Sequence, residues 1–161
     1  RQQAGKRILH EGFDQRGKMM QIQLVTLDGV KFDEDAYAVV LPTIDGEITV
    51  LQGHMPLLTA LKQGAMIIRR HKDDDDAKLE QYAIFGGVAD IGSGRIRILS
   101  DEATHGDEIN FAETEKAKAE AERQLANAKD KVEIERAQAL VDRHTVRLNV
   151  ANLRRRSKPR G

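Results

Sequence analysis

The chain has 161 residues, no net charge and no cysteine, and 40% of its residues are hydrophobic. This length suffices for one buried core with a small appendage, and the lack of cysteine excludes a disulfide framework, a thiolate nucleophile and a zinc–thiolate site. Equal numbers of acidic and basic residues leave no overall field that would favour nucleic acid or an anionic membrane, and no apolar run approaches the roughly 20 residues of a membrane span.

Residues 1–18 precede the first readable pattern. They lack the apolar stretch of a secretory signal, and the sequence does not begin with methionine. We interpret this segment as a native extension or as a remnant foreign to the native chain, and we assign no function to it.

Short stretches with period-two hydrophobicity begin at Gln21. Ile22 and Leu24 alternate with glutamines in QIQLVT, the same alternation recurs in EITVL and RIRIL, and AYAVVL and AMIIRR add β-branched runs. Turn signals separate these stretches, among them Asp28-Gly29 and Asp45-Gly46. Because no helical run interrupts them, we predict an antiparallel β-sandwich or flattened barrel over residues 19–106.

The stretch HKDDDDAKLEQ places four consecutive aspartates, Asp73 to Asp76, between two predicted strands. A dedicated calcium loop uses spaced ligands, and consecutive carboxylates at a hairpin tip lack that spacing. We interpret the stretch as a solvated loop and expect no metal site there.

A helical period replaces the strand period after Asp107. FAETEKAKAEAERQLANAK is rich in strong helix formers, and KVEIERAQALVDRHTVRLNVANL continues the pattern after a short link. The two helices should fold back on each other, which predicts an antiparallel helix-loop-helix with a basic tail over residues 107–161. The expected facing stripes are Ala117, Ala121, Leu125 and Ala128 in the first helix, and Ile134, Ala137, Val141, His144 and Leu148 in the second.

The facing stripe of the first helix is mostly alanine. Alanine buries little area, so at about 25 cal/mol per Å² the hairpin gains less from burial than a leucine-rich pair of helices would. We therefore expect the hairpin to detach from the sandwich at low cost, as a switching element must.

The chain ends in RRRSKPRG, a basic tail that allows two interpretations. In the first, the positive charges complement the dipole of the last helix and the residues after it form a frayed tail. In the second, the positive charges pair with carboxylates on a partner. Composition leaves both open.

Motifs for catalysis are absent from the sequence. It contains no GxxxxGK[ST] phosphate loop, no HExxH pair and no GxSxG elbow, and its five histidines are dispersed. His144 lies on the predicted helical stripe and is interpreted as a packing or interhelical hydrogen-bonding residue rather than a metal ligand. We expect a chain that is not an enzyme and that has no cofactor.

Two strings carry a resemblance to a known family. GEITVLQGHMPLLTALKQGAM is followed by YAIFGGVADI and then by the alanine-rich helical hairpin. In this order the strings resemble the epsilon subunit of bacterial F-type ATP synthases, over Met20 to about Leu153. One departure is Gln52, where the family commonly has proline, so the loop that enters the string should be less rigid.

The resemblance implies a non-catalytic subunit of the central stalk. In that family a sandwich packs on the gamma subunit and stands on the ring of c subunits, so that proton-driven rotation reaches the catalytic head. It implies a peripheral position on the cytoplasmic side of the inner (plasma) membrane. The residues implied at the contact with the ring or gamma, on one lower surface, are Asp45, Gly46, Glu47, Gly53, His54, Met55 and Pro56. For His54, a purely structural role in holding its loop stays open.

The resemblance also implies regulation by the hairpin. In the family it switches between a compact form on the sandwich and an extended form that reaches the alpha/beta head and blocks ATP hydrolysis. Basic residues of the last helix then approach an acidic segment of the head. The matching candidates are Arg136, Arg143, Arg147, Arg154, Arg155 and Arg156.

Some family members bind ATP through an I/L-D-x-x-R-A motif at the start of the first helix, helped by two arginines on the second. The matching stretch has Asn110 in place of the carboxylate and Glu113 in place of the arginine, while Arg143 and Arg147 match the helpers. Since a glutamate repels phosphate, we predict no tight ATP binding.

The periodicities alone also fit a free-standing β-sandwich adaptor that captures a partner helix with its hairpin. Copurification with ATP synthase subunits would separate the two hypotheses. A nucleic-acid partner would rest on the basic tail alone and is not expected.

Overall fold

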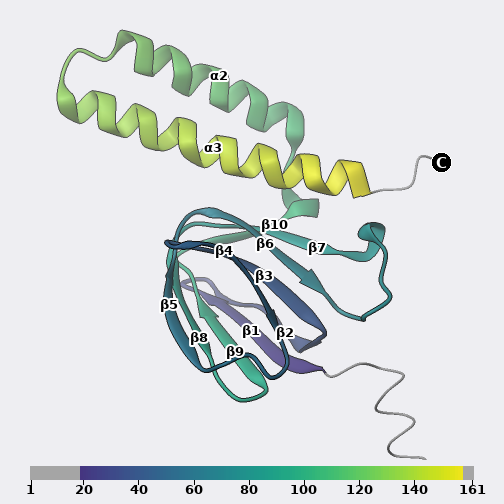
Figure 1. Ribbon diagram of the computed structural model, residues 1–161. Helices are drawn as coiled ribbons and strands as arrows, with labels where there is room; N and C mark the ends of the chain where they lie inside the picture. Colours follow the sequence, from purple (N-terminus) through teal and green to yellow (C-terminus); the bar gives the residue numbers. More distant parts are fainter. Residues whose placement is uncertain (1–18, 158–161) are drawn as a thin grey trace, which may run out of the picture.

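The computed structural model describes residues 19–157 as a ten-stranded sandwich that carries a pair of long helices (Figure 1). The predicted segment 1–18 and the tail residues 158–161 lie outside this range. The strands are β1 Met20–Thr26, β2 Gly29–Ala36, β3 Ala38–Thr43, β4 Gly46–Leu51, β5 Leu57–Leu61, β6 Gly64–Arg69, β7 Glu80–Ile84, β8 Gly87–Ile91, β9 Arg95–Leu99 and β10 Ala103–His105. The helices are α2 Phe111–Asn127 and α3 Lys131–Ser157, with short 3-10 turns η1 Asp76–Lys78 and η2 Gly106–Glu108.

The strands form one curled sheet in the order β10-β7-β6-β3-β5-β8-β9-β1-β2, with β4 paired to β3. All pairings are antiparallel except that of β1 with β9, which is parallel. The predicted antiparallel sandwich followed by a two-helix hairpin is therefore confirmed.

The core lies between the sandwich layers and follows the period-two pattern. Ile22, Leu24, Ile96 and Ile98 are fully or almost fully buried, whereas the intervening Arg95 and Arg97 are exposed. Each fully buried aliphatic side chain of this kind contributes about 1.5–3 kcal/mol. This core closes without the helices, because its main cluster is drawn from strand residues only.

Local capping sets where both helices begin. The Asn110 side chain accepts a 3.0 Å hydrogen bond from the Glu113 backbone N–H and starts α2. Asp130 accepts a 2.8 Å bond from the Glu133 N–H in the same way at α3. No helix within residues 19–157 has the length and apolar content to cross a membrane.

The helices lie side by side, and α3 is the one next to the sandwich (Figure 1). Ala121 and Ala137 are buried between them, in agreement with the predicted stripes. Ile134 is different: 45% of it is exposed, so its predicted place in the seam is wrong. The sequence pattern also missed a second buried face of α3, where Val146 and Val150 pack on β6 and β7 residues.

The predicted acidic loop connects β6 and β7, but it is less solvated than expected. The Asp74 carboxylate is only 9% exposed and accepts a 3.0 Å hydrogen bond from the backbone N–H of His71. The guanidinium of Arg69 donates to the Asp74 carbonyl. This aspartate therefore shapes the loop.

Candidate functional site

The Asp45–Glu47 candidates form a tight turn at one end of the sandwich. The Thr43 hydroxyl donates a 2.5 Å hydrogen bond to the Gly46 carbonyl and accepts one of 3.2 Å from the Asp45 N–H. Gly46 has a φ of +118°, which favours glycine. The turn therefore presents Asp45, Glu47 and the exposed Ile44 to solvent on a rigid base.

The Gly53–Pro56 candidates form a loop between β4 and β5. Gly53 has a φ of +89°, and the His54 N–H donates a 3.1 Å hydrogen bond to the Leu51 carbonyl. The His54 Nδ1 lies 2.7 Å from the Met55 carbonyl oxygen, and Met55 is 78% exposed. The histidine thus holds the loop while the methionine projects from it, so a scaffold role and an exposed contact coexist here.

The structure does not bring these two candidate sets together. Strand β4 runs from Gly46 to Leu51 between them. A strand advances about 3.3 Å per residue, which separates its ends by roughly 17 Å. The two sets therefore occupy opposite ends of β4.

The sequence pattern missed an apolar row on the outer face of the sandwich. Cross-strand pairing aligns Val30 with Val25, Val25 with Leu99, Leu99 with Val88, and Val88 with Ala60. These five residues, hereafter the apolar row, cross the neighbouring strands β2, β1, β9, β8 and β5 (Figure 1). All are exposed except the half-buried Val25. An exposed apolar strip of this kind is typical of a protein contact.

The six candidate arginines fall into two groups. Arg143 and Arg147 both bond the carboxylate of Glu102, Arg147 at 2.6 Å, and Arg154 bonds Asp107 at 2.5 Å. The other three, Arg136, Arg155 and Arg156, are exposed, and Arg155 also stacks on the ring of Phe111. Three of the six arginines therefore form ion pairs within the chain when the hairpin is docked on the sandwich.

The Arg143–Arg147 cluster alters two acid–base equilibria. Burial alone would raise the pKa of Glu102, but the hydrogen bonds and charges of the two arginines outweigh it and lower that pKa. Burial, followed by the charges of Arg147 and Arg143, lowers the pKa of His144. Both shifts stabilise the charge pattern in which Glu102 is the anion and His144 is neutral.

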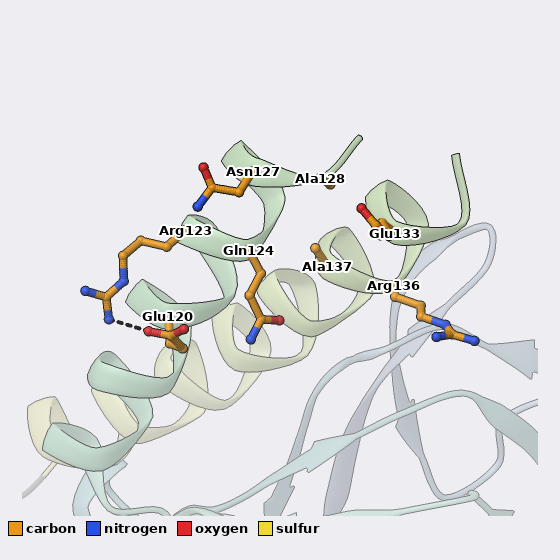
Figure 2. Close-up of a pocket in the computed structure, with 8 residues that line it drawn as sticks. All are labelled: Glu120, Arg123, Gln124, Asn127, Ala128, Glu133, Arg136 and Ala137. Atoms are coloured by element: carbon orange, nitrogen blue, oxygen red, sulfur yellow. Dashed lines mark hydrogen bonds and ion pairs between the residues drawn. The ribbon is translucent and has the colours of Figure 1, made fainter. Parts of the chain in front are cut away.

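A groove of about 640 Å³ opens between the helices near their connecting turn. Figure 2 shows Glu120 and Arg123 paired on α2, while Arg136 extends from α3 away from α2. The small Ala128 and Ala137 lie along the groove and leave it unfilled. The thin alanine seam predicted from the sequence is thus a real feature of the hairpin.

The stretch that departs from the ATP-binding motif has a structural role. Asn110 caps α2, and the carboxylate-bearing Glu113 occupies the first turn of that helix. The two arginines that match the helper positions are bonded to Glu102.

Two family models match the chain and divide it between sandwich and helices. "ATP synthase, Delta/Epsilon chain, beta-sandwich domain" matches residues 19–106, and "ATP synthase, Delta/Epsilon chain, long alpha-helix domain" matches residues 107–152. The chain belongs to the ATP synthase delta/epsilon chain family. As an epsilon-type member it is a non-catalytic stalk subunit of an F-type ATP synthase, peripheral to the membrane. This membership decides against a free-standing adaptor.

Individual relatives agree with the family models. An ATP synthase epsilon chain of Herpetosiphon aurantiacus is 34% identical over 136 residues, which cover 84% of this chain and 96% of that one. A chain in the mitochondrial ATP synthase of Euglena gracilis has a TM-score of 0.64 at 23% identity, covering 88% of this chain and 82% of its own. A chain in the central stalk and c-ring structure of the Tetrahymena thermophila mitochondrial ATP synthase has a TM-score of 0.58 at 13% identity. This match covers 84% of the present chain and 98% of the Tetrahymena chain. The two structural matches show a shared fold.

Proposed function

We propose that this epsilon-type chain is a rotor subunit with two tasks. Its sandwich passes the rotation of a proton-driven c-ring through gamma to the alpha/beta head, and its helical hairpin restrains ATP hydrolysis. The proposed location is the cytoplasmic side of the inner (plasma) membrane. The observation that carries the proposal is a sandwich with its own closed core, beside a hairpin whose contact with it combines a separate small apolar cluster with ion pairs.

The proposed contact with gamma is the apolar row. Leu99 and Val88 expose apolar surface on adjacent strands, and Val25 of β1 joins them to the exposed Val30 of β2. Solvent exposure of a continuous strip is unfavourable unless a partner covers it. The next row toward the Gly53–Pro56 end is mostly polar and pairs Gln23 with Arg97. A hydrophobic centre with a polar rim is the usual composition of a stable protein interface.

The proposed contact with the ring uses the Asp45–Glu47 turn. Its exposed carboxylates and backbone suit the polar loops of a ring, and the hydrogen bonds of Thr43 limit the entropy lost on docking. The Gly53–Pro56 loop is proposed as a separate contact with the ring or gamma, in which Met55 supplies adaptable apolar surface.

The proposed restraint on hydrolysis requires α3 to leave the sandwich. Arg136, Arg155 and Arg156 are available to a partner's carboxylates in either form, whereas Arg143, Arg147 and Arg154 become available only on release. The seam that must open holds a small apolar cluster with Val150, Ala83 and Phe85 buried in it. We further propose that the chain does not bind ATP tightly, and calorimetry that finds micromolar affinity for ATP would contradict this.

Reconstitution tests the two tasks together. A catalytic head that lacks this subunit is mixed with the full chain, with a chain that ends at Asp107, or with a full chain carrying Leu99→Gln and Val88→Gln. We expect the full chain to bind and lower hydrolysis, the shortened chain to bind without lowering it, and the double variant to bind weakly. Unchanged hydrolysis on loss of the helices would refute the restraint, and unchanged binding of the double variant would refute the gamma contact.

A further inference from the structure

A single carboxylate joins the hairpin to the sandwich at the middle of α3. Glu102 lies in the link between β9 and β10, and the guanidinium groups of Arg143 and Arg147 each bond one of its oxygens. The arginines are one helical turn apart, so their side chains project from the same face of α3. They are 41 and 45 residues from Glu102 in the chain, which makes the contact wholly tertiary.

The sandwich supports this contact with an aromatic ring. The guanidinium carbons of Arg143 and Arg147 lie 4.3 Å and 5.0 Å from the centre of the Phe85 ring. Phe85 is buried, and its backbone N–H donates a 3.2 Å hydrogen bond to the Glu102 carbonyl. The backbones of Glu102 and Phe85 are thus joined within the sandwich, and their side chains offer both guanidiniums a charge partner and a stacking surface.

Apolar and polar contacts accompany this cluster across the seam. Val146 and Val150 join a small cluster with Ala65, Ala83, Phe85 and Ile109, and Arg154 bonds Asp107 and the Ala77 carbonyl near the end of α3. The α2 helix packs chiefly on α3 and follows the sandwich in the chain through the η2 link. Release of α3 therefore releases both helices, and it must break the Glu102 cluster together with the apolar contacts of Val146 and Val150.

We infer that Glu102 is an internal counter-ion that latches the hairpin in its compact form and sets how readily it opens. In the compact form both arginines are turned toward Glu102 and stacked on Phe85, so a partner that takes them fully into its own contact must separate them from Glu102. This regulatory consequence rests on the proposed restraint of hydrolysis, whereas the latch itself is a property of the isolated chain.

The latch is tested on the isolated full chain. Because the sequence has no cysteine, Lys62→Cys and Ala139→Cys place one spin label on the exposed surface of the sandwich and one on α3. Pulsed electron–electron double resonance then measures the distribution of distances between the two labels, which gives the fraction of molecules with an undocked α3. We expect Glu102→Gln to raise the ratio of undocked to docked molecules about fivefold, as for a partly exposed but doubly bonded ion pair. The matched control, Asp101→Asn, removes the neighbouring exposed charge and should leave the ratio unchanged.

A coupled variant separates the latch from a general loss of stability. In a chain that already carries Arg143→Gln and Arg147→Gln, adding Glu102→Gln should change the ratio by less than about a factor of two, because its partners are gone. An equal rise in both backgrounds, or no rise in the first, would overturn the latch. If the latch holds but Glu102→Gln leaves hydrolysis unchanged in the reconstituted complex, the proposed restraint fails and the latch stands.

Discussion

Gly87 lies so close to Leu99 that a β-carbon at Gly87 would be 1.9 Å from the Leu99 carbonyl oxygen. Gly87 also has a φ of +118°, a conformation that other residues rarely adopt. We therefore expect Gly87→Ala to lower the free energy of unfolding by more than about 2 kcal/mol, since backbone must move to relieve the overlap. Urea unfolding followed by circular dichroism would measure the loss.

The adjacent Gly86 provides the control. Its φ is +75°, but an added β-carbon would meet no atom within 4 Å. Gly86→Ala should lower the free energy of unfolding by about 1 kcal/mol, the cost of holding an alanine in the left-handed conformation. Equal losses for the two variants would show that close packing against Leu99 does not explain the second glycine of the FGG string.

Alkaline pH should destabilise the sandwich through Tyr82. Burial, and then the charge of Glu80, raise the pKa of Tyr82 to about 12, from about 10 in an unfolded chain. The contribution of Tyr82 to the free energy of unfolding is fully present below about pH 10. It is lost as pH rises toward 12, because only the unfolded tyrosine ionises in that window. The slope from this group should reach about 1.4 kcal/mol per pH unit. Tyr82→Phe should remove it, as measured by urea unfolding at several pH values.

Acid pH should loosen the hairpin through Glu102. The pKa of Glu102 is lowered in the folded chain, because the bonds from its arginines outweigh the effect of burial. Its contribution is therefore present above the ordinary carboxyl pKa of 4.5 and is lost as pH falls through the lower folded value. We expect less than about 1 kcal/mol, because the pair is partly exposed. Hydrogen exchange of α3 amides should differ between the native chain and Glu102→Gln at neutral pH, and should converge in acid.

Sequence patterns predicted the sandwich wherever burial follows period two, as in Ile22 and Leu24 of β1. Strand β2 was not predicted, because it buries Phe32 and Ala36 and exposes the three residues between them. Such a pattern lacks the alternation of a strand, although the pairing of β2 with β1 forms one.

Contacts that depend on distant register could not be predicted. The apolar row exists because β1 pairs in parallel with β9, which places Val25 beside Leu99. The bond between Glu102 and Arg147 likewise depends on where α3 crosses the sheet. The candidate residues Asp45 and His54 came from a resemblance, and the length of β4 shows that nearness in sequence did not make them neighbours in space.

The alanine seam between α2 and α3 should not accept larger side chains. Ala121 is 3% exposed and faces α3, so Ala121→Leu must push the helices apart. We expect a loss of about 1–3 kcal/mol, with a lower helical signal before the sandwich unfolds. The control is Ala119→Leu on the exposed face, which should change stability by less than about 0.5 kcal/mol. Thermal unfolding monitored by circular dichroism would compare them, and equal effects would mean that the seam is not closely packed.

Crosslinking from the two ends of β4 tests which end meets which partner. With no native cysteine, Asp45→Cys and Met55→Cys each create a single reactive site, and both side chains are exposed. Because the two ends of β4 lie roughly 17 Å apart, a short crosslinker should join these positions to different subunits of the complex, or to widely spaced residues of one. Mass spectrometry of the crosslinked peptides would identify the partners. Strand pairing places Thr43 in the same row as Thr26, so Asp28→Cys in the β1–β2 turn should share partners with position 45. If positions 45 and 55 crosslinked to the same residue of one ring subunit, their assignment to separate contacts would be wrong.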